Sequence, residues 1–143
     1  MILRGWEEKD VPKIAELEKE CFADAWSKDL FSQSLSTPFF HGVLFENEGE
    51  IVAYACQTVI FDDAEILNVA VRKEYRGQGL AKKMLGEMEN QAKKLGASKS
   101  FLEVRVGNQA AIGLYRRFEY ENLRVRKGYY EDGEDALVMC KQL

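Results

Sequence analysis

Long apolar runs are missing from this 143-residue chain, and several residue types that define other protein classes are scarce. No stretch approaches the ~20 apolar residues that span a bilayer, and the charged segment Met1–Glu8 does not fit a signal peptide. With 2 prolines and 11 glycines, collagen-like and Pro/Gly-rich disordered chains are excluded. The length and the 46% hydrophobic content predict one compact cytoplasmic domain over residues 1–143.

Cysteine and histidine are also scarce, which narrows the possible chemistry. The three cysteines, Cys21, Cys56 and Cys140, cannot all pair within one chain, and none has a Cys-x-x-Cys or zinc-site spacing. We interpret them as small hydrophobic residues of a reducing compartment, and we predict no metal site. The single histidine, His41, excludes most Ser-His-Asp and histidine–metal schemes. Any catalysis therefore falls to carboxylates, tyrosines and backbone groups.

Basic residues are fewer than acidic ones: the chain has 20 Lys and Arg residues and 24 Asp and Glu residues, which gives a net charge of −4. This balance argues against non-specific nucleic-acid binding, which needs a basic surface. The charges are nevertheless clustered. A basic group lies between Arg72 and Lys83, and an acidic group lies at Glu131–Asp135. One local site is therefore suited to an anion and another to a cation.

What the sequence does contain is a regular alternation of strand and helix patterns. Strands are expected at 2–6, 42–46, 51–60, 64–71, 100–106, 121–126 and 136–141, and helices at 10–21, 27–35, 79–95 and 108–118. Asp10 is expected to cap the first helix, and the apolar stripe of the third runs from Leu80 to Leu95. Asp62-Asp63 is expected to form a turn. The order predicts an α/β fold with a central mixed, mostly antiparallel twisted sheet and helices on both faces.

The loop Arg76–Ala81 joins a strand expected to be buried to the longest predicted helix. Its glycines, Gly77 and Gly79, allow backbone N–H groups to turn toward a bound oxygen, and the helix start adds partial positive charge. The loop is therefore built like a phosphate cradle. It fits neither the P-loop, which needs Gly-Lys-Ser/Thr, nor the dinucleotide fingerprint, which needs Gly or Ala where Lys82 stands. An ordinary strand–helix turn remains the alternative.

The pattern Arg76-x-x-Gly79-x-Ala81, preceded by Asn68–Tyr75, resembles the acetyl-CoA pyrophosphate loop of the GNAT superfamily of N-acetyltransferases. The predicted order of elements also matches the GNAT fold across nearly the whole chain. The resemblance implies that acetyl-CoA is held by one strand, by this loop and by a residue at the start of the last helix. The residues so implied are Val69, Ala70, Val71, Arg76, Gly77, Gln78, Gly79, Leu80, Ala81 and Asn108.

Further stretches resemble the ribosomal-protein alanine N-acetyltransferases of the RimI type. They are Cys21–Ser27, Leu102–Arg105, Asn108–Tyr115 and Arg126–Tyr130. Two departures from that group are visible: Ala25 replaces the proline before Trp26, and Glu119-Tyr120 replaces the usual Gly-Phe. Neither departure changes a group that makes or breaks bonds, so both bear on acceptor identity more than on acetyl transfer.

Glu103 and Tyr115 are the candidate catalytic residues. Strand alternation places Glu103 on the same face as Phe101 and Arg105, and the residues alone leave open a solvent-facing glutamate or an ion pair with Arg105. Helical spacing alone leaves Tyr115 as a core aromatic residue. The resemblance implies that Glu103 accepts the amine proton and that Tyr115 protonates the coenzyme A sulfur. Asn108 is expected to cap its helix in either case.

The predicted function is acetyl-CoA-dependent transfer of an acetyl group to the N-terminal alanine amine of a ribosomal protein, by a monomer or weak dimer. Two alternatives remain open: a GNAT that acetylates lysine side chains or a small amine, and a coenzyme-A-binding module without catalysis. The acidic segment Glu131–Asp135 and the pair Tyr129-Tyr130 are candidates for binding a basic acceptor, with a solvated hairpin turn as the alternative. Neither nucleic acid nor a membrane is expected as a partner.

Overall fold

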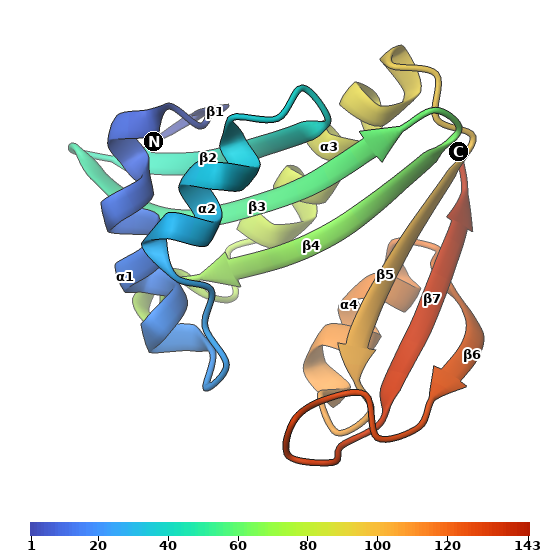
Figure 1. The fold of residues 1–143 in the computed structure, drawn as a ribbon. Coiled ribbons are helices and arrows are strands. Elements are labelled where there is room, and N and C mark those ends of the chain that lie inside the picture. The colour runs from blue at the N-terminus through green and yellow to red at the C-terminus, as the bar shows by residue number, and fades with distance from the viewer.

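The computed structural model describes all 143 residues and contains a seven-stranded sheet (Figure 1). The strands are β1 (Ile2–Gly5), β2 (Phe40–Asn47), β3 (Glu50–Ile60), β4 (Asp63–Val71), β5 (Lys99–Arg105), β6 (Glu121–Arg126) and β7 (Ala136–Gln142). The helices are α1 (Val11–Cys21), α2 (Lys28–Leu35), α3 (Leu80–Lys94) and α4 (Gln109–Arg117), with short 3-10 turns η1 (Glu8–Asp10) and η2 (Lys73–Tyr75). The strand order is β1-β2-β3-β4-β5-β7-β6, and only β4 and β5 are parallel. The predicted mixed, mostly antiparallel sheet is confirmed.

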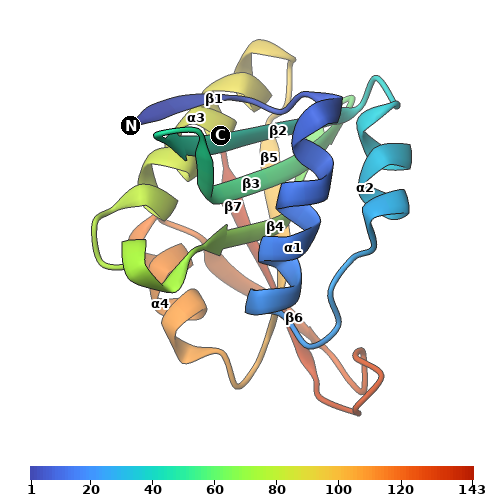
Figure 2. The ribbon, with the colours of Figure 1, turned by 90° about the vertical axis from the view of Figure 1, so that its left-hand side faces the viewer.

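Helices cover the two faces of the sheet unequally (Figure 2). On one face, α3 and α4 pack over a large apolar cluster that includes Met84, Met88 and Tyr115. On the other face, α1 and α2 pack on β2, β3 and β4 over an aromatic cluster centred on Trp6. Neither α1 nor α2 makes a comparable contact with β5, β6 or β7. The far half of the sheet is therefore uncovered on this second face.

The parallel pair β4–β5 separates along its length. The two strands are paired only where Asp63–Ile66 lies beside Lys99–Leu102, and β4 then continues to Val71 without β5. The separation starts at a bulge, because Cys56 of β3 pairs with Asn68 while Gln57 pairs with Ile66, leaving Leu67 unpaired. A bulge bends its strand and increases its twist. The result is the V-shaped opening between the carboxyl ends of β4 and β5 in Figure 1.

The predicted elements all occur, with ends displaced by at most two residues. Ser27 caps α2 by accepting a hydrogen bond from the Leu30 N–H at 3.1 Å, and Asn108 caps α4 in the same way through Ala111. The hairpin between β2 and β3 turns at Glu48-Gly49, where φ is +52° and +83°. Such angles are those of a two-residue type I′ turn, whose twist matches the flanking strands. At these positions the neighbouring residues in the sequence are sufficient to predict the local structure.

Three local predictions were wrong. Asp10 does not cap α1; its carboxylate instead accepts the Glu7 N–H in η1 and pairs with Arg4 at 2.8 Å. Leu95 does not join the buried stripe of α3, because the helix ends before it and its side chain is 52% exposed. The turn between β3 and β4 lies at Phe61-Asp62 rather than Asp62-Asp63. For Asp10 the contact with Arg4, and for the turn the pairing of Ile60 with Asp63, outweighs the local preference. At Leu95 the helix ends before Gly96, whose φ is +95°.

Candidate active site

A cavity of about 400 Å³ lies where β4 and β5 separate. Both predicted catalytic residues, Glu103 and Tyr115, line it, together with Val69 and Asn108 from the predicted cofactor set. The other predicted cofactor residues follow directly along the chain, at the end of β4 and in the loop before α3. The structure therefore brings the predicted residues to one end of the molecule.

Glu103 stands on β5 with a carboxylate that the protein leaves partly unpaired. Its side chain is 20% exposed, and its nearest cation is the Nε atom of Arg126, 3.5 Å from Oε2. That same oxygen is buried and accepts no hydrogen bond. The ion pair with Arg105 that the sequence left open does not form, since Arg105 has other partners. A buried acceptor without a hydrogen bond is uncommon, and here the charge of the oxygen is compensated only by the ion pair with Arg126.

Tyr115 reaches the same cavity from α4. Its side chain is 8% exposed, and its ring packs edge-on against Tyr120 with 6.0 Å between the ring centroids. Burial raises the pKa of Tyr115 above its usual value of 10.0. The phenol is therefore protonated throughout the neutral range, as a proton donor must be before it reacts.

The loop before α3 presents a row of free backbone donors. The N–H groups from Gly77 to Lys82 donate no hydrogen bond within the protein; the first amide of the helix to do so is that of Lys83, to the Gly79 carbonyl at 3.1 Å. Gly77 and Gly79 have φ of +82° and +79°, and a Cβ on either would meet nothing within 4 Å. Glycine is needed there for the backbone conformation, not for space. Free amides at a helix N-terminus fit a phosphate.

Two residues of the predicted cofactor set are restricted in what they can offer. The Leu80 side chain is 4% exposed and packs in the core, so only its backbone is available to a ligand. Arg76 is exposed, but its Nε atom donates to the Val71 carbonyl at 3.0 Å. A second nitrogen of the guanidinium, Nη2, lies 3.8 Å from the Cys21 sulfur at the end of α1.

The edge of β4 beyond Ile66 is the other source of free backbone groups. Val69, Ala70 and Val71 pair with β3 on one side, while β5 has already diverged on the other. The Ala70 side chain is buried in the aromatic cluster, so this segment can contact a ligand in the V through its main chain. Backbone polar groups that lack a strand partner are available to an extended ligand.

Glu18 is a buried residue of this cavity that sequence reasoning missed. It is 1% exposed and accepts hydrogen bonds from the Tyr54 hydroxyl, from Asn68 Nδ2 at 2.8 and 3.0 Å, and from the Trp26 N–H at 3.0 Å. Its acceptor capacity is used within the protein, which makes it a structural carboxylate. The available signal was Asn68, a polar residue in the otherwise apolar segment 66–71 that needed a partner.

Arg105 closes one side of the cavity by joining two distant loops. Its guanidinium contacts Asp24 at 2.9 Å, Asp132 at 2.8 Å and Glu134 at 3.0 Å, and lies 4.0 Å from the centre of the Tyr130 ring. Two carboxylates of the acidic segment predicted to bind an acceptor are thus already paired. Asp135 is also engaged, with Gly128 and Lys127.

No group of three or more His, Cys, Asp or Glu side chains is placed to hold a metal ion. None of the helices has the length and apolar character that crossing a membrane requires. All three cysteines are unpaired; Cys56 is buried, and Cys21 and Cys140 are partly buried.

Comparison with known proteins identifies the family, since the profile of the Acetyltransferase (GNAT) family matches residues 11–120. The chain therefore belongs to the GNAT family, as the loop pattern predicted, and the protein is an N-acetyltransferase.

Individual relatives narrow the comparison. A Bacillus subtilis (strain 168) protein, provisionally named [ribosomal protein bS18]-alanine N-acetyltransferase, is 37% identical over 96% of this chain and 92% of its own. The crystal structure of the Escherichia coli ribosomal-protein-S18-alanine N-acetyltransferase superposes with a TM-score of 0.90 at 30% identity, covering 99% of this chain and 92% of that one. Arabidopsis thaliana NAA60 in complex with acetyl-CoA shares the fold, with a TM-score of 0.90 at 16% identity over 99% and 98% of the two chains.

Proposed function

We propose that this protein transfers the acetyl group of acetyl-CoA to the N-terminal alanine amine of a ribosomal protein. The observation that carries the proposal is the shared cavity, where the partly unpaired carboxylate of Glu103 and the protonated phenol of Tyr115 lie beside the free edge of β4. The acceptor is inferred from the relatives named for bS18-alanine acetylation. A ribosomal acceptor would place the reaction in the cytoplasm.

The donor, acetyl-CoA, supplies the activated thioester, and this chain supplies its binding groups. The free amides of residues 77–82 suit the pyrophosphate, with Arg76 and Lys82 as nearby cations. The main chain of Val69–Val71 suits the pantetheine arm, and Asn108 lies at the other side of the cavity. One N–H of that segment, directed at the acetyl oxygen, would stabilise the developing negative charge by roughly 2.7–4 kcal/mol.

Glu103 serves as the general base in this proposal. An α-amino group has a pKa near ~7.7–8.0 and a lysine near ~10.4, so deprotonation at neutral pH costs roughly 1 kcal/mol for the first and about 4–5 kcal/mol for the second. A carboxylate acting through one water is therefore better suited to an N-terminal amine than to lysine. The Glu103 carboxylate, whose side chain is 20% exposed and lines the cavity, is the acceptor for that proton.

Tyr115 serves as the general acid. When the thioester bond breaks, the negative charge passes to sulfur, and the phenol proton is the one available from a group already buried in the cavity. Its raised pKa means that the phenol carries its proton at neutral pH before the reaction. Glu18, the remaining buried carboxylate, is excluded as the base because its oxygens are occupied by protein donors.

The test is to map the acetylated atom. The purified protein, acetyl-CoA and an octapeptide that begins with alanine and contains one internal lysine are incubated, and the product is fragmented by mass spectrometry. We expect acetyl on the terminal amine and none on the lysine. The matched control is the same peptide with its terminus already blocked, which we expect to remain unmodified.

The competing functions give different results in the same experiment. Acetyl on the lysine of the blocked peptide would support a lysine acetyltransferase, and turnover of small amines alone would support a small-molecule enzyme. Calorimetric binding of coenzyme A without turnover of any amine would support a binding module. Absence of binding to acetyl-CoA would contradict every one of these functions.

A further inference from the structure

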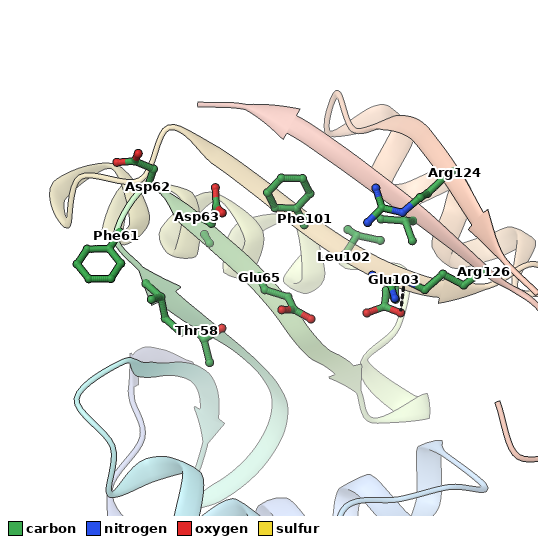
Figure 3. Close-up of a pocket in the computed structure, with 13 residues that line it drawn as sticks. Thr58, Phe61, Asp62, Asp63, Glu65, Phe101, Leu102, Glu103, Arg124 and Arg126 are labelled. Atoms are coloured by element: carbon green, nitrogen blue, oxygen red, sulfur yellow. Dashed lines mark ion pairs between the residues drawn. The ribbon is translucent and has the colours of Figure 1, made fainter. Parts of the chain in front are cut away.

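A second cavity, of about 550 Å³, lies on the uncovered face of the sheet. Its lining residues come from the β3–β4 turn and from strands β3, β4, β5, β6 and β7, and Figure 3 draws them as sticks. The strand register puts these side chains on one face: Thr58, Glu65 and Phe101 lie side by side, as do Glu103, Val138 and Arg124. No helix packs over this part of the face, so the hollow is open along the sheet.

This hollow is continuous with the active site. Glu65 and Glu103, on neighbouring strands, line both cavities. Burial and the Glu103 carboxylate raise the pKa of Glu65, while Arg126 opposes the shift. A cation placed beside two such carboxylates relieves their repulsion. The acceptor amine would share these carboxylates with Arg126, which lies 3.5 Å from Glu103.

The two long sides of the hollow carry opposite charge. Asp62, Asp63 and Glu65 stand on the β3–β4 side, and Arg124 and Arg126 stand on the β6 side. Apolar surface from Phe101 and Val138 lies between them. Such a channel suits an extended polypeptide, which presents carbonyl oxygens, N–H groups and side chains in alternation.

Phe61 marks the far end of the channel, away from Glu103 (Figure 3). Its side chain is 89% exposed and its φ is +53°. A bulky residue in the left-handed region is strained, and Gly or Asn would occupy this turn at lower cost. Nothing within the fold repays that cost, because the ring is in solvent. An exposed ring on a strained turn beside the hollow is available for a contact with a bound molecule.

We infer that this channel binds the extended segment that follows the acetylated residue of the acceptor, with Glu65 beside the amine and Phe61 against a side chain further along. The inference rests on the proposed function. Phe61 lies four residues before Glu65 in the chain. On the neighbouring parallel strand Phe101 pairs with Glu65, and Glu103 lies two residues further in the same direction. At ~3.3 Å per residue this is roughly 20 Å, so an extended acceptor reaches Phe61 at about its sixth residue.

The test compares kcat/KM for a tripeptide and an octapeptide that share their first residues. For the wild type we expect the octapeptide to be favoured by roughly tenfold or more. Phe61→Asn, which the positive φ accepts, should bring that ratio close to one, and Arg124→Gln should lower it partly. The matched control is Leu95→Asn, an exposed apolar residue at the end of α3 on the opposite face, which should keep the wild-type ratio.

Each result decides one question. If the wild type shows the same kcat/KM for both peptides, or if Phe61→Asn keeps the wild-type ratio, the proposed peptide channel is wrong. Neither result contradicts N-terminal acetylation. An equal loss in Leu95→Asn shows a non-specific effect and also overturns the channel. Failure to acetylate the terminal amine of either peptide is a separate result, because it removes the proposed function itself.

Discussion

Two glutamates line the same cavity and have opposite surroundings. Glu18 belongs to the half of the sheet that helices cover on both faces, and protein donors occupy both of its oxygens. Glu103 belongs to the half that is covered on one face, and its Oε2 accepts no hydrogen bond and has only the Arg126 guanidinium nearby. The difference shows that two carboxylates of one cavity can have opposite roles: the hydrogen bonds of Glu18 stabilise the structure, whereas Glu103 lacks such a set of protein donors.

The largest effect is expected where the free carboxylate is neutralised. Glu103→Gln should lower kcat by roughly 10²–10⁴ because the general base is lost, and should change the unfolding free energy by less than ~0.5 kcal/mol. Steady-state acetylation and urea denaturation measure the two quantities. The control is Glu121→Gln on β6, an exposed residue, which should leave both unchanged. A fall in kcat of less than tenfold would remove Glu103 from the base's role.

In the covered half, a methyl group added to the packed core should lower the stability of the protein. A Cβ added at Gly42 would lie 2.5 to 2.7 Å from the Trp6 indole, and that ring is held edge-on by Phe31, Phe40 and Tyr54. Gly42→Ala should therefore destabilise the protein by about 1–3 kcal/mol, since the indole cannot move away. Thermal denaturation measures the effect.

The matched control for that substitution lies inside α3. A Cβ at Gly86 meets nothing within 4 Å, so Gly86→Ala should raise the melting temperature by removing a helix-interior glycine, a gain of up to ~1 kcal/mol. Equal melting temperatures for the two alanine variants would show that the Trp6 cluster is looser than the distances indicate.

Glu18→Gln is the direct counterpart of Glu103→Gln. The amide NH₂ would face the donors of Asn68 or Trp26, so we expect a loss of roughly 1–3 kcal/mol in unfolding free energy and a kcat per folded molecule within tenfold of the wild type. Glu16→Gln, on the exposed side of the same helix, is the control and should be neutral. If Glu18→Gln lowered kcat as far as Glu103→Gln, kcat would no longer distinguish Glu103 from Glu18 as the general base.

The smallest expected effect is a pH dependence in the covered half. The hydrogen-bonded Arg4 guanidinium holds the pKa of Asp10 below its usual 3.8. Because the folded pKa is the lower one, this stabilisation is complete above about pH 4–5 and is lost as the pH falls through the folded pKa. The unfolding free energy of Asp10→Asn should therefore fall less steeply than that of the wild type as the pH is lowered from 6 to 2, as measured by urea denaturation. Parallel curves for variant and wild type would show that this pair adds nothing.

Much of the site was predictable because its signals are local. The glycines of the loop before α3, the cap at Asn108 and the alternation that puts Glu103 on one face of β5 depend on a few neighbouring residues. The partners of Glu18 and Arg105 were not predictable, because they come from elements up to 81 residues apart in the chain. Residue spacing along β5 suggested an ion pair between Glu103 and Arg105. In the structure Glu103 pairs with Arg126, and Arg105 pairs with Asp24.

The order of elements and the glycine conformations of the loop before α3 follow from the sequence, since apolar periodicity and backbone preferences act over short distances. The roles proposed for Glu103 and Tyr115 come from the resemblance to the GNAT superfamily, not from periodicity. Tertiary structure alone decided which carboxylate is saturated and which is free, and that a second hollow continues from the first. Those outcomes depend on where the bulge at Leu67 bends β4 and on how far two helices extend over the sheet. Both are set by the packing of distant segments, which no local pattern encodes.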